Sequence, residues 1–415
     1  MTEELIYKVI LIIVLADFVL ERVLSRLNYV SSKQPIPEKL NGIYDQEKYQ
    51  KSQAYNGVLT RFGNLSATFS FVLMFLALYF GWFGLLDSWV RDFSPLEPVT
   101  PLIFFAVLYV ISDLIGLPFS IYQTFVIEEK FGFNKTTAKT FVMDKIKGYL
   151  LAIIIGGLLL AVFIYLVTFM GSGFWIYFWG VITVFVLLAN MFYTSWILPL
   201  FNKLTPMEEG ELKSSIQAFS DKVSFPLSNI FVIDGSKRSS KGNAFFSGLG
   251  KRKKVVLYDT LIEKHTTEEL TAVFAHEIGH FKKKHIYLST VLSILQTGLM
   301  LFILSKMILS SELSYAMGGD MTALHLNMLA FGILYSPVSH ILGVIMNMIS
   351  RKNEYEADEY AVRHYDGKPL ISALKKMSSD HLSNLTPHPA YVFMHYSHPS
   401  LLQRVESMEK AIDSQ

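Results

Sequence analysis

Seven long apolar stretches, separated by polar segments, set the pattern of this chain of 415 residues. Each has roughly the 20 residues that a helix needs to cross the hydrocarbon core of a bilayer. They lie at Leu5–Val23, Leu65–Leu86, Leu102–Val126, Leu150–Met170, Phe174–Leu200, Ile286–Leu309 and Ala323–Ile349. Because lipid offers no hydrogen-bond partners to the backbone, such stretches are expected to be helical. The pattern predicts a mainly α protein with seven transmembrane helices.

The composition agrees with a membrane protein. Hydrophobic residues make up 51% of the chain and charged residues 17%, which is too apolar for an ordinary soluble protein of this length. The first stretch is expected to be a retained span rather than a signal peptide. Glu3, Glu4 and Lys8 give it no basic leading region, and no small-residue cleavage site follows it.

Basic residues alternate from one connecting segment to the next. They are frequent after the first, third, fifth and seventh stretches, as at Lys251–Lys254 and Arg351–Lys352, and scarce in the segments between. The positive-inside rule then places these segments and the C-terminus in the cytosol, with the N-terminus outside. Topology and contacts with lipid headgroups account for the basic clusters. No nucleic-acid partner is expected, because no recognition motif accompanies them.

The strongest chemical signal is the H-E-x-x-H pentapeptide His276–His280, which lies just before the sixth stretch. On a helix its two histidines stand four residues apart on one face and can bind one zinc ion. Glu277 projects beside them, where it can take a proton from a water molecule at the metal. Small residues at Ala275 and Gly279 allow another element to pack closely there. These observations favour a zinc peptidase whose active site faces the cytosol.

The segment from Asn202 to His285 is the one sizeable insertion between apolar stretches. It begins with a polar helix over Glu208–Val223 and continues with strands at Asn229–Gly235, Asn243–Phe246 and Val255–Asp259, the last two joined by a turn at Gly248–Lys251. An extended peptide can add to the edge of such a sheet and so be held beside the metal. The alternative is that the strands only form a small core, and the sequence leaves both open.

A catalytic zinc ion usually has three protein ligands, so one remains to be found. The chain has no cysteine, and therefore the third ligand is a histidine or a carboxylate. The segment after His280 lacks the third histidine of the metzincin pattern. Glu354 is the better candidate, because Glu354 and Asp358 share a helix face and Asp358 can accept a hydrogen bond from a ligating histidine.

Neighbouring acidic residues leave room for another interpretation. Glu356 and Glu359 are expected to point elsewhere on the helix. An acidic first turn of a cytosolic helix would also explain the whole segment without any metal.

The sequence resembles the type I CaaX prenyl endopeptidases and their bacterial relatives. These are the integral-membrane zinc proteases that process a-factor and prelamin A. The resemblance rests on six matching segments in the same order. They are Ile127–Thr136, Gly242–Phe246, Val255–Leu261, the H-E-x-x-H, the E-x-x-x-D of Glu354 and Asp358, and His395–Arg404. The H-E-x-x-H alone is shared by many zinc peptidases, whereas the whole set is specific.

The resemblance implies a role for each matching position. His276, His280 and Glu354 would bind one Zn²⁺, Glu277 would be the general base, and Asp358 would hydrogen-bond a ligand. His398 would stabilise the oxyanion, Arg404 would order the surrounding region, and Asn243 and Ala244 would line the strand that holds the peptide. Without the resemblance, His395 and His398 read as loop histidines that satisfy backbone groups.

The resemblance also implies the architecture. The fold would be a seven-helix membrane protein that encloses an intramembrane chamber, with a gluzincin-like cytosolic part containing a small β-sheet. Residues 1–201 would form an N-terminal membrane domain with five spans. Residues 202–415 would form the zinc metallopeptidase domain, with the sheet, the H-E-x-x-H helix, the last two spans and a C-terminal helical part.

Three functions follow as hypotheses. The first is a zinc endopeptidase that cleaves near the C-terminus of CaaX-type substrates, prenylated in a eukaryote. It would act as a monomer in the endoplasmic reticulum membrane, or in the cytoplasmic membrane of a bacterium. The second is an HtpX-like quality-control protease, which the full N-terminal half disfavours because those proteases are shorter. The third is a non-enzymatic, zinc-regulated membrane protein, which a fourth protein ligand to the metal would favour.

Overall fold

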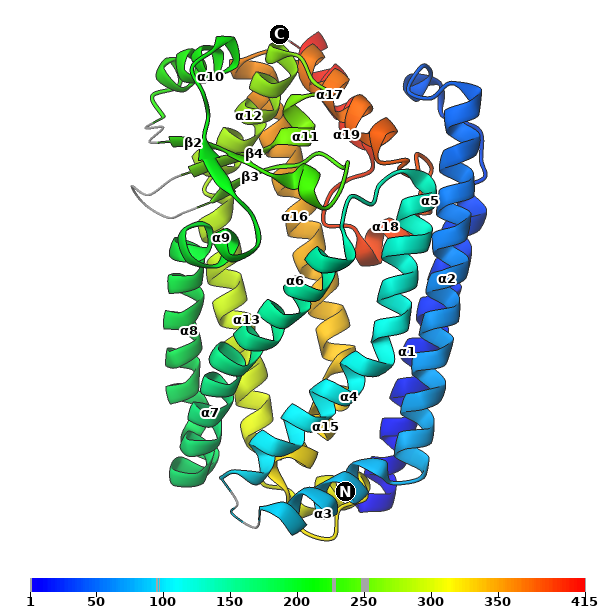
Figure 1. Cartoon of the computed structure of the whole chain (residues 1–415), viewed down its shortest axis with the longest axis vertical. Coiled ribbons are helices and arrows are strands. Elements are labelled where there is room, and N and C mark those ends of the chain that lie inside the picture. The colour runs from blue at the N-terminus through cyan, green and yellow to red at the C-terminus, as the bar shows by residue number, and fades with distance from the viewer. Residues whose placement is uncertain (1, 95, 97, 226–228, 248–253, 415) are drawn as a thin grey trace.

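The computed structural model describes the whole chain except residues 1, 95, 97, 226–228, 248–253 and 415. Long helices run the length of the molecule, and a four-stranded sheet lies at one end, close to the C-terminus (Figure 1). The N-terminus lies at the opposite end. The expectation of a mainly helical protein with one small sheet is confirmed.

The helices of the N-terminal half are α1 (Glu3–Ser31), α2 (Gln46–Tyr79), α3 (Trp82–Phe93), α4 (Thr100–Tyr122), α5 (Glu129–Phe131), α6 (Ala138–Leu151), α7 (Gly157–Met170), α8 (Phe174–Phe192) and α9 (Leu198–Phe201). Those of the C-terminal half are α10 (Glu211–Lys222), α11 (Asp259–Ile262), α12 (Thr267–Lys282), α13 (His285–Met307), α14 (Ser311–Ala316), α15 (Leu324–Leu334), α16 (Ser336–His364), α17 (Gly367–Asp380), α18 (Pro389–His395) and α19 (Leu401–Asp413).

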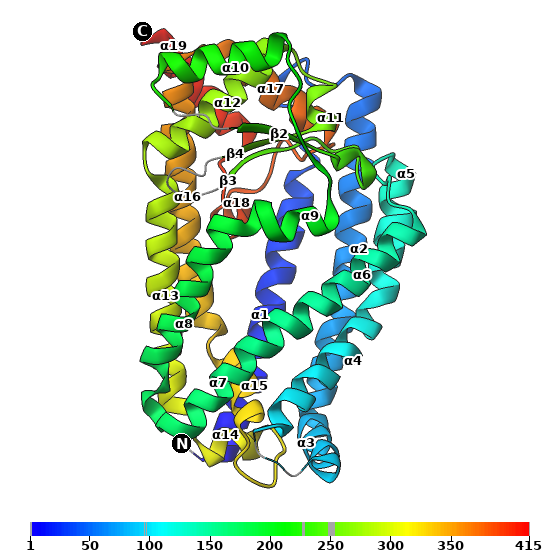
Figure 2. The ribbon, with the colours of Figure 1, turned by 60° about the vertical axis from the view of Figure 1, so that its left-hand side comes forward.

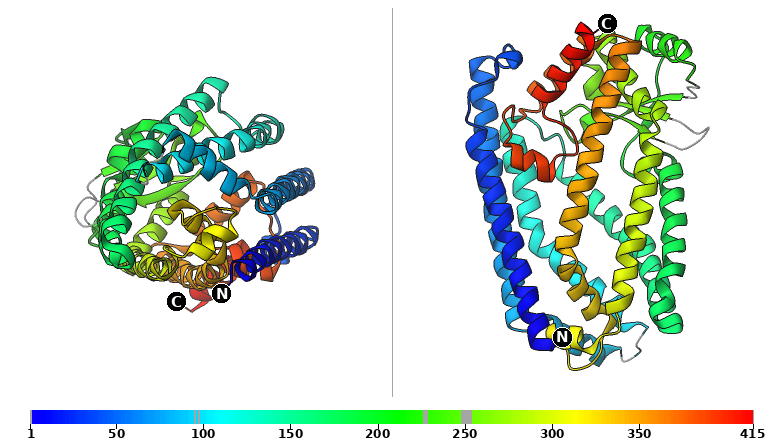
Figure 3. Two further views of the ribbon diagram at one scale, coloured as in Figure 1. Left: turned by 90° about the horizontal axis from the view of Figure 1, so that it is seen from below. Right: turned by 180° about the vertical axis from the view of Figure 1, so that it is seen from behind.

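The long helices follow one another around the periphery when the molecule is seen end-on (Figure 3). Helices α8 and α13 run side by side (Figure 2), and the indole N–H of Trp179 on α8 donates to the Ile294 carbonyl on α13 over 2.8 Å. Many apolar side chains of the long helical segments are exposed, including Ile153, Leu158 and Val184, which are 57–70% exposed. Such a surface suits a lipid environment rather than water.

The described residues contain four helical segments that are long and apolar enough to cross a membrane: Gln46–Tyr79, Thr100–Phe131, Ala138–Phe201 and His285–Met307. A fifth is reached if α15 and α16, which are bent by 52° at their junction, count as one span. The expected number of seven is therefore not confirmed. The expected fourth and fifth spans fall within the single 64-residue segment, which turns at Gly171–Gly173.

Two expected spans have the wrong boundaries. The stretch Leu65–Leu86 is not one helix, because α2 ends at Tyr79 and Gly81 adopts a left-handed φ of +63° before α3 begins. The stretch Ala323–Ile349 is broken between α15 and α16, where Pro337 stands in the first turn of α16. Proline lacks the N–H that would continue the preceding helix. The hydropathy of the sequence does not reveal either of these two helix breaks.

The sheet has the strand order β1-β2-β4-β3, with β1 at Leu204–Pro206, β2 at Asn229–Ile233, β3 at Ala244–Ser247 and β4 at Lys254–Tyr258. Strand β2 pairs with β4 in parallel, and the other pairs are antiparallel. The three expected strands are present, whereas the short β1 was not predicted. The expected turn at Gly248–Lys251 lies outside the described residues. Among the described strands β3 is an edge, so its outer side is open to a partner.

Helix α12 is the centre of the core at this end of the molecule. Leu270, Phe274 and Ile278 are at most 2% exposed and pack with residues of β4, α10, α16 and α17. At Gly279 a Cβ atom would lie 3.0 Å from both the Cα and the carbonyl oxygen of Ala357 on α16. The absence of a side chain at Gly279 therefore sets how closely α12 approaches α16.

The start of α12 is fixed by a capping box. Thr266 accepts from the Glu269 N–H, while the Glu269 carboxylate accepts from the Thr266 N–H. The same carboxylate accepts from Ser372 (2.6 Å) and Lys376 (2.7 Å), both on α17. Burial alone would raise the pKa of Glu269, but these hydrogen bonds outweigh it and lower the pKa below its usual value.

Replacing Gly279 by Val is expected to force α12 and α16 apart, because the neighbouring atoms at 3.0 Å belong to the backbone of Ala357. We expect a loss of stability of about 1–3 kcal/mol, as for other overpacked cores, and a weaker hold on metal. Thermal unfolding in detergent and metal content measure both. The control is Gly343→Val on α16, where an added Cβ meets no atom within 4 Å. An equal effect of both substitutions would contradict this account.

Replacing Glu269 by Gln is expected to remove about 1–3 kcal/mol of stability at neutral pH, the range for a hydrogen bond that involves a buried charge. Because the folded pKa is lowered, this stability is present above the unfolded pKa and is lost as the pH falls through the folded value. The difference in melting temperature from the unmodified protein should therefore shrink below about pH 4, near the unfolded pKa of Glu. The exposed Glu263→Gln should show no such difference; a pH-independent deficit for Glu269→Gln would contradict the assignment.

Candidate metal centre and active site

Helices α12 and α16 bring three metal-ligating side chains to one point. His276 Nε2 lies 3.1 Å from His280 Nε2, and the Glu354 carboxylate oxygens lie 3.2 Å from His280 Nε2 and 3.5 Å from His276 Nε2. The two histidines are one helical turn apart on α12, and Glu354 comes from α16 through the close contact at Gly279. These three are the group that can hold a metal ion within the part of the chain that the structure describes.

The geometry fits a tetrahedral zinc ion. Zinc–nitrogen and zinc–oxygen bonds of about 2.0–2.1 Å place the ligands of a tetrahedral ion about 3.3 Å apart. The observed separations of 3.1 to 3.5 Å bracket that value. Among the described residues the group supplies three ligands, the number in catalytic zinc sites, where a fourth position holds water or substrate.

The atoms that would coordinate the metal also suit a positively charged ion. Glu354 is 4% exposed, and among the described residues its buried Oε2 atom accepts no hydrogen bond, although Arg404 Nη1 lies 3.4 Å and His276 Nε2 3.5 Å away. A buried carboxylate oxygen that accepts no hydrogen bond is costly, and a bound cation relieves that cost. The residues present therefore fit a metal ion of the kind that His and carboxylate ligands prefer.

Asp358 and Arg404 form a buried pair behind the ligands. Arg404 donates two parallel hydrogen bonds to Asp358, of 2.8 and 2.6 Å, and Asp358 also lies 2.9 Å from His276 Nδ1. An acceptor at Nδ1 fixes the tautomer of His276 that presents the Nε2 lone pair to a metal. Although burial alone would lower the pKa of Arg404, Asp358 and Glu354 raise it above its usual range.

His280, like His276, has a polar partner at its Nδ1 atom, and the sequence did not predict this partner. Its Nδ1 lies 3.0 Å from His285 Nδ1, and His285 Nε2 lies 3.1 Å from Glu356 Oε2. Glu356 was expected to point elsewhere on the helix, and it contacts His285 rather than one of the three ligands; the start of α13 places His285 between Glu356 and His280. The nearness of His285 to His280 along the chain was the available signal, but contact with Glu356 depends on where α13 begins relative to α16 in the folded chain.

A large cavity opens in front of the three ligands. It has a volume of about 1200 Å³ and is lined by residues of β3, α12, α13, α16 and α17, including Asn243, Ala244 and Glu277. We call it the active-site cavity. Glu277 is half-buried in its wall, and burial raises the pKa of this carboxyl, although nearby His276 and His280 oppose the rise. A raised pKa suits a group that must accept and return a proton.

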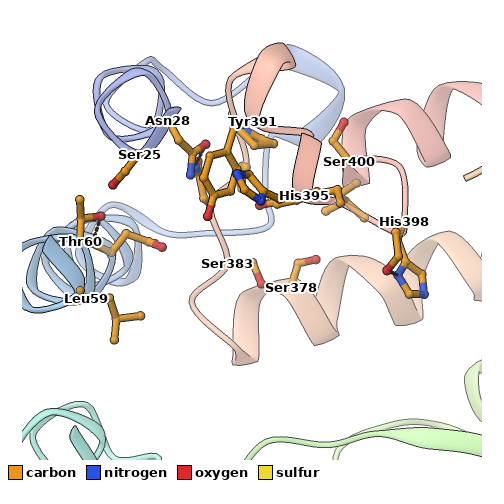
Figure 4. A pocket seen from close by; sticks show the side chains of 18 of the residues that line it. Ser25, Asn28, Leu59, Thr60, Ser378, Ser383, Tyr391, His395, His398 and Ser400 are labelled. Carbon is orange, nitrogen blue, oxygen red and sulfur yellow. Dashed lines mark hydrogen bonds between the residues drawn. The ribbon is translucent and has the colours of Figure 1, made fainter. Parts of the chain in front are cut away.

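His398 stands between the active-site cavity and a second cavity. Its Nε2 lies 3.3 Å from Glu354 Oε1, and its side chain is 61% exposed. The second cavity, of about 750 Å³, is lined by α1, α2 and the segment that carries α17 and α18, with His398 at one end (Figure 4). Its labelled walls are mostly polar: Ser25, Asn28, Thr60, Ser378, Ser383, Tyr391, His395 and Ser400. His398 therefore reaches the ligand group from a water-compatible space.

Ala244 is the first residue of the edge strand and Asn243 directly precedes it; both line the active-site cavity beside the ligands. Ala244 begins β3, which contacts α12, and the Asn243 carbonyl accepts from the Tyr258 N–H on β4. Every candidate site residue from the sequence thus borders the active-site cavity or contacts a residue that does. His395 lines only the second cavity and lies 3.5 Å from Glu21 on α1.

Known families match almost the entire chain. Residues 26–203 match the family described as CAAX prenyl protease N-terminal, five membrane helices, and residues 206–412 match peptidase family M48. The CAAX prenyl protease 1 homolog of Arabidopsis thaliana is 35% identical over 386 residues, which cover 90% of each chain. The CAAX prenyl protease 1 of Saccharomyces cerevisiae is 34% identical, with 95% of this chain and 93% of the relative covered.

A solved structure has the same fold. The crystal structure of S. mikatae Ste24p superposes with a TM-score of 0.92 at 33% sequence identity, over 97% of this chain and 99% of that one. Similarity along nearly the whole of both chains includes the membrane helices as well as the metal centre. The chain therefore belongs to peptidase family M48, in the branch that carries the CAAX prenyl protease N-terminal region, and is an integral membrane metalloendopeptidase.

Proposed function

We propose that this protein is a zinc endopeptidase that cleaves prenylated CaaX-type proteins near their C-terminus. The observation that carries the proposal is the convergence of His276, His280 and Glu354 beside the open edge of β3. A metal with one free coordination position next to an unpaired strand suits peptide hydrolysis, because the strand can hold an extended peptide beside the metal. The names of the relatives in A. thaliana and S. cerevisiae, both CAAX prenyl proteases, support the substrate class.

One Zn²⁺ per chain would be held by His276, His280 and Glu354, with Asp358 fixing His276 and His285 fixing His280. The ion would supply Lewis acidity to the attacking water and the scissile carbonyl. Glu277 takes the proton of that water and passes it to the leaving amine. His398 donates to the oxygen that becomes negative, and Arg404 keeps Asp358 in place.

Peptide binding would use the edge of β3. An extended substrate pairs with Asn243 and Ala244, and its main-chain hydrogen bonds hold the scissile bond beside Glu277. A cavity of about 1200 Å³ exceeds the space that a peptide backbone fills. The prenyl group therefore has room in the same interior.

The membrane arrangement remains part of the proposal. We favour seven spans around an intramembrane chamber. The 64-residue segment that turns at Gly171–Gly173 is long enough for two crossings, and the 29 residues of α1 are long enough for one, although Lys8, Asp17 and Glu21 make α1 less apolar. The cavities on both sides of His398 support an interior chamber.

Domains, location and oligomeric state complete the proposal. Residues 1–201 form the membrane domain and residues 202–415 the peptidase domain, a division supported by the two family matches, which meet between residues 203 and 206. The positive-inside rule favours a cytosolic active site. Eukaryotic relatives favour the endoplasmic reticulum over a bacterial cytoplasmic membrane. We propose that a monomer is active, because one chain supplies all three ligands.

Replacing Glu277 by Gln is expected to leave folding and zinc content unchanged but to lower the rate of peptide cleavage by about 10²–10⁴-fold, the contribution of a general base. Purified protein would be assayed on a farnesylated CaaX peptide and on an unmodified membrane-protein fragment. Glu359→Gln, on the exposed side of α16, is the matched control and should keep its activity. Unchanged cleavage by Glu277→Gln would refute the role, and equal cleavage of both substrates would refute the prenyl preference.

Replacing Asp358 by Asn is expected to weaken zinc binding by about 10–100-fold, as for other residues that orient a metal-ligating histidine. The substitution removes the charge that His276 and Arg404 share. Zinc affinity would be measured by competition with a chelator, with Glu359→Gln again as the control. Affinity within a factor of about two of the unmodified protein would show that Asp358 has no such role.

A further inference from the structure

Helix α3 connects two membrane spans without being one itself. The sequence predicted that its first residues continue the second span, but α3 begins after the break at Gly81 and lies across the long axis of the molecule, at the end opposite the sheet (Figure 1). Its 12 residues are too few to cross a bilayer, which takes about 20. The helices before and after it, α2 and α4, are both apolar enough to cross. Helix α3 therefore lies where the chain leaves and re-enters the membrane.

The side of α3 that faces the protein is closely packed. Phe83 and Val90 are buried there in an apolar cluster with residues of α1, α2, α4 and α15. Gly84 lies against the loop that follows α14, where an added Cβ would collide with the carbonyl group of Gly318. The helix cannot turn about its own axis without breaking these contacts.

The acidic group on this side is paired inside the protein. Asp87 accepts a hydrogen bond from Arg91 one turn later (2.8 Å) and lies 2.7 Å from His325 Nε2 on α15. Asp87 and His325 are both buried. Moving α3 relative to α15 would leave buried polar groups without their partners, which is costly. The packing and this pair together fix which side of α3 points outward.

The outward side of α3 is apolar and rich in aromatic residues. Trp82, Leu85, Trp89 and Phe93 are spaced by three and four residues, which places them on one side of the helix. They are 42–70% exposed, and neither of the two cavities described above is lined by α3. A contiguous apolar surface of this kind marks a site of interaction with lipid or protein. Tryptophan is enriched where a membrane meets water, which favours lipid.

The outward side of α3 also continues the lipid-facing surface of α2. At the end of α2 the rings of Tyr79 and Phe80 are in contact at a centroid distance of 5.1 Å, and Phe80 stacks on Trp82 of α3 at 6.3 Å. Trp89 and Phe93 form a further pair at 4.8 Å. Tyr79 and Phe80 are exposed, like the rings of α3. The row of rings thus leads from a membrane span directly onto α3.

A polar strip borders the apolar side. Ser88 and Asp92 are exposed and lie one turn apart on its flank. A helix with an apolar side, a polar border and no length to span lies in the plane of the membrane surface, with its apolar side about 5–10 Å into the boundary between headgroups and acyl chains. The order of residues around α3 matches that arrangement.

We infer that α3 is an interfacial helix whose side chains Trp82, Leu85, Trp89 and Phe93 are inserted into the lipid at the membrane surface opposite the sheet. Because α3 is docked on α15, it holds the beginning of α15 at the same depth. The inference goes beyond the proposed function and does not depend on the substrate.

The test uses the absence of cysteine from the chain, which allows single cysteines to be labelled with a nitroxide. Full-length protein with Trp89→Cys or Phe93→Cys would be placed in phosphatidylcholine vesicles. Electron paramagnetic resonance would then measure collisions of the label with oxygen, which concentrates in lipid, and with a water-soluble nickel chelate. Both labels should lie about 5–10 Å below the lipid phosphates. Asp92→Cys, on the polar strip, is the matched control and should collide with the chelate several-fold more often.

Two results would overturn the inference. Equal collision with the chelate at positions 89, 92 and 93 would place α3 in water. Exclusion of both oxygen and the chelate at positions 89 and 93 would show that a second copy of the chain or another protein covers the apolar side. The metal content of each variant, compared with that of the unmodified protein, shows whether it folds.

A second measurement covers the case in which a labelled variant does not fold. The fluorescence of the conservative variant Trp89→Phe in vesicles is subtracted from that of the unmodified protein, which isolates the emission of Trp89. Lipids brominated close to the headgroup should quench this emission more strongly than lipids brominated near the end of the acyl chain, and iodide in the water should quench it least. Stronger quenching by iodide than by either lipid would overturn the inference.

Discussion

The close approach of α12 and α16 is the constraint on which the rest of the site depends. Two of the ligands come from α12 and the third from α16, and only the absence of a side chain at Gly279 lets the helices meet at Ala357. A separation greater by even half an ångström would spoil a coordination sphere that tolerates about 0.2 Å. Backbone packing thus sets the metal geometry, and the ligand side chains follow from it.

Around this contact the protein buries charged side chains. Glu354, Asp358 and Arg404 are each less than 9% exposed. Buried ions are costly unless each has a partner, and here Arg404 pairs with Asp358 and approaches Glu354 at 3.4 Å. The Glu354 Oε2 atom that Arg404 approaches accepts no hydrogen bond among the described residues, and a divalent cation would balance its charge. The C-terminal helix α19 contributes Arg404, so the last segment of the chain is part of the metal centre.

Some of the fold could be predicted because its causes are local. Apolar stretches become helices wherever they lie in lipid, and the strands β2, β3 and β4 have the residues that strands favour. The span boundaries failed where one residue decides the outcome, at Gly81 and at Pro337. Hydropathy is an average over a window and does not register a single backbone break. Strand β1 was not predicted, because three residues ending in proline have no recognisable strand pattern.

The sequence by itself determined the chemistry of the site, since the spacing of His276 and His280 already fixes their common face on any helix. It also indicated Glu354, Asp358 and His398 as residues whose side chains suit metal binding and catalysis. Only the tertiary structure decided which side chains contact one another around the site. His285 and Glu356 contact each other across 71 residues, and Lys241 meets Glu128 across 113. Such contacts depend on the angles between helices, which come from packing summed over many side chains rather than from any local pattern.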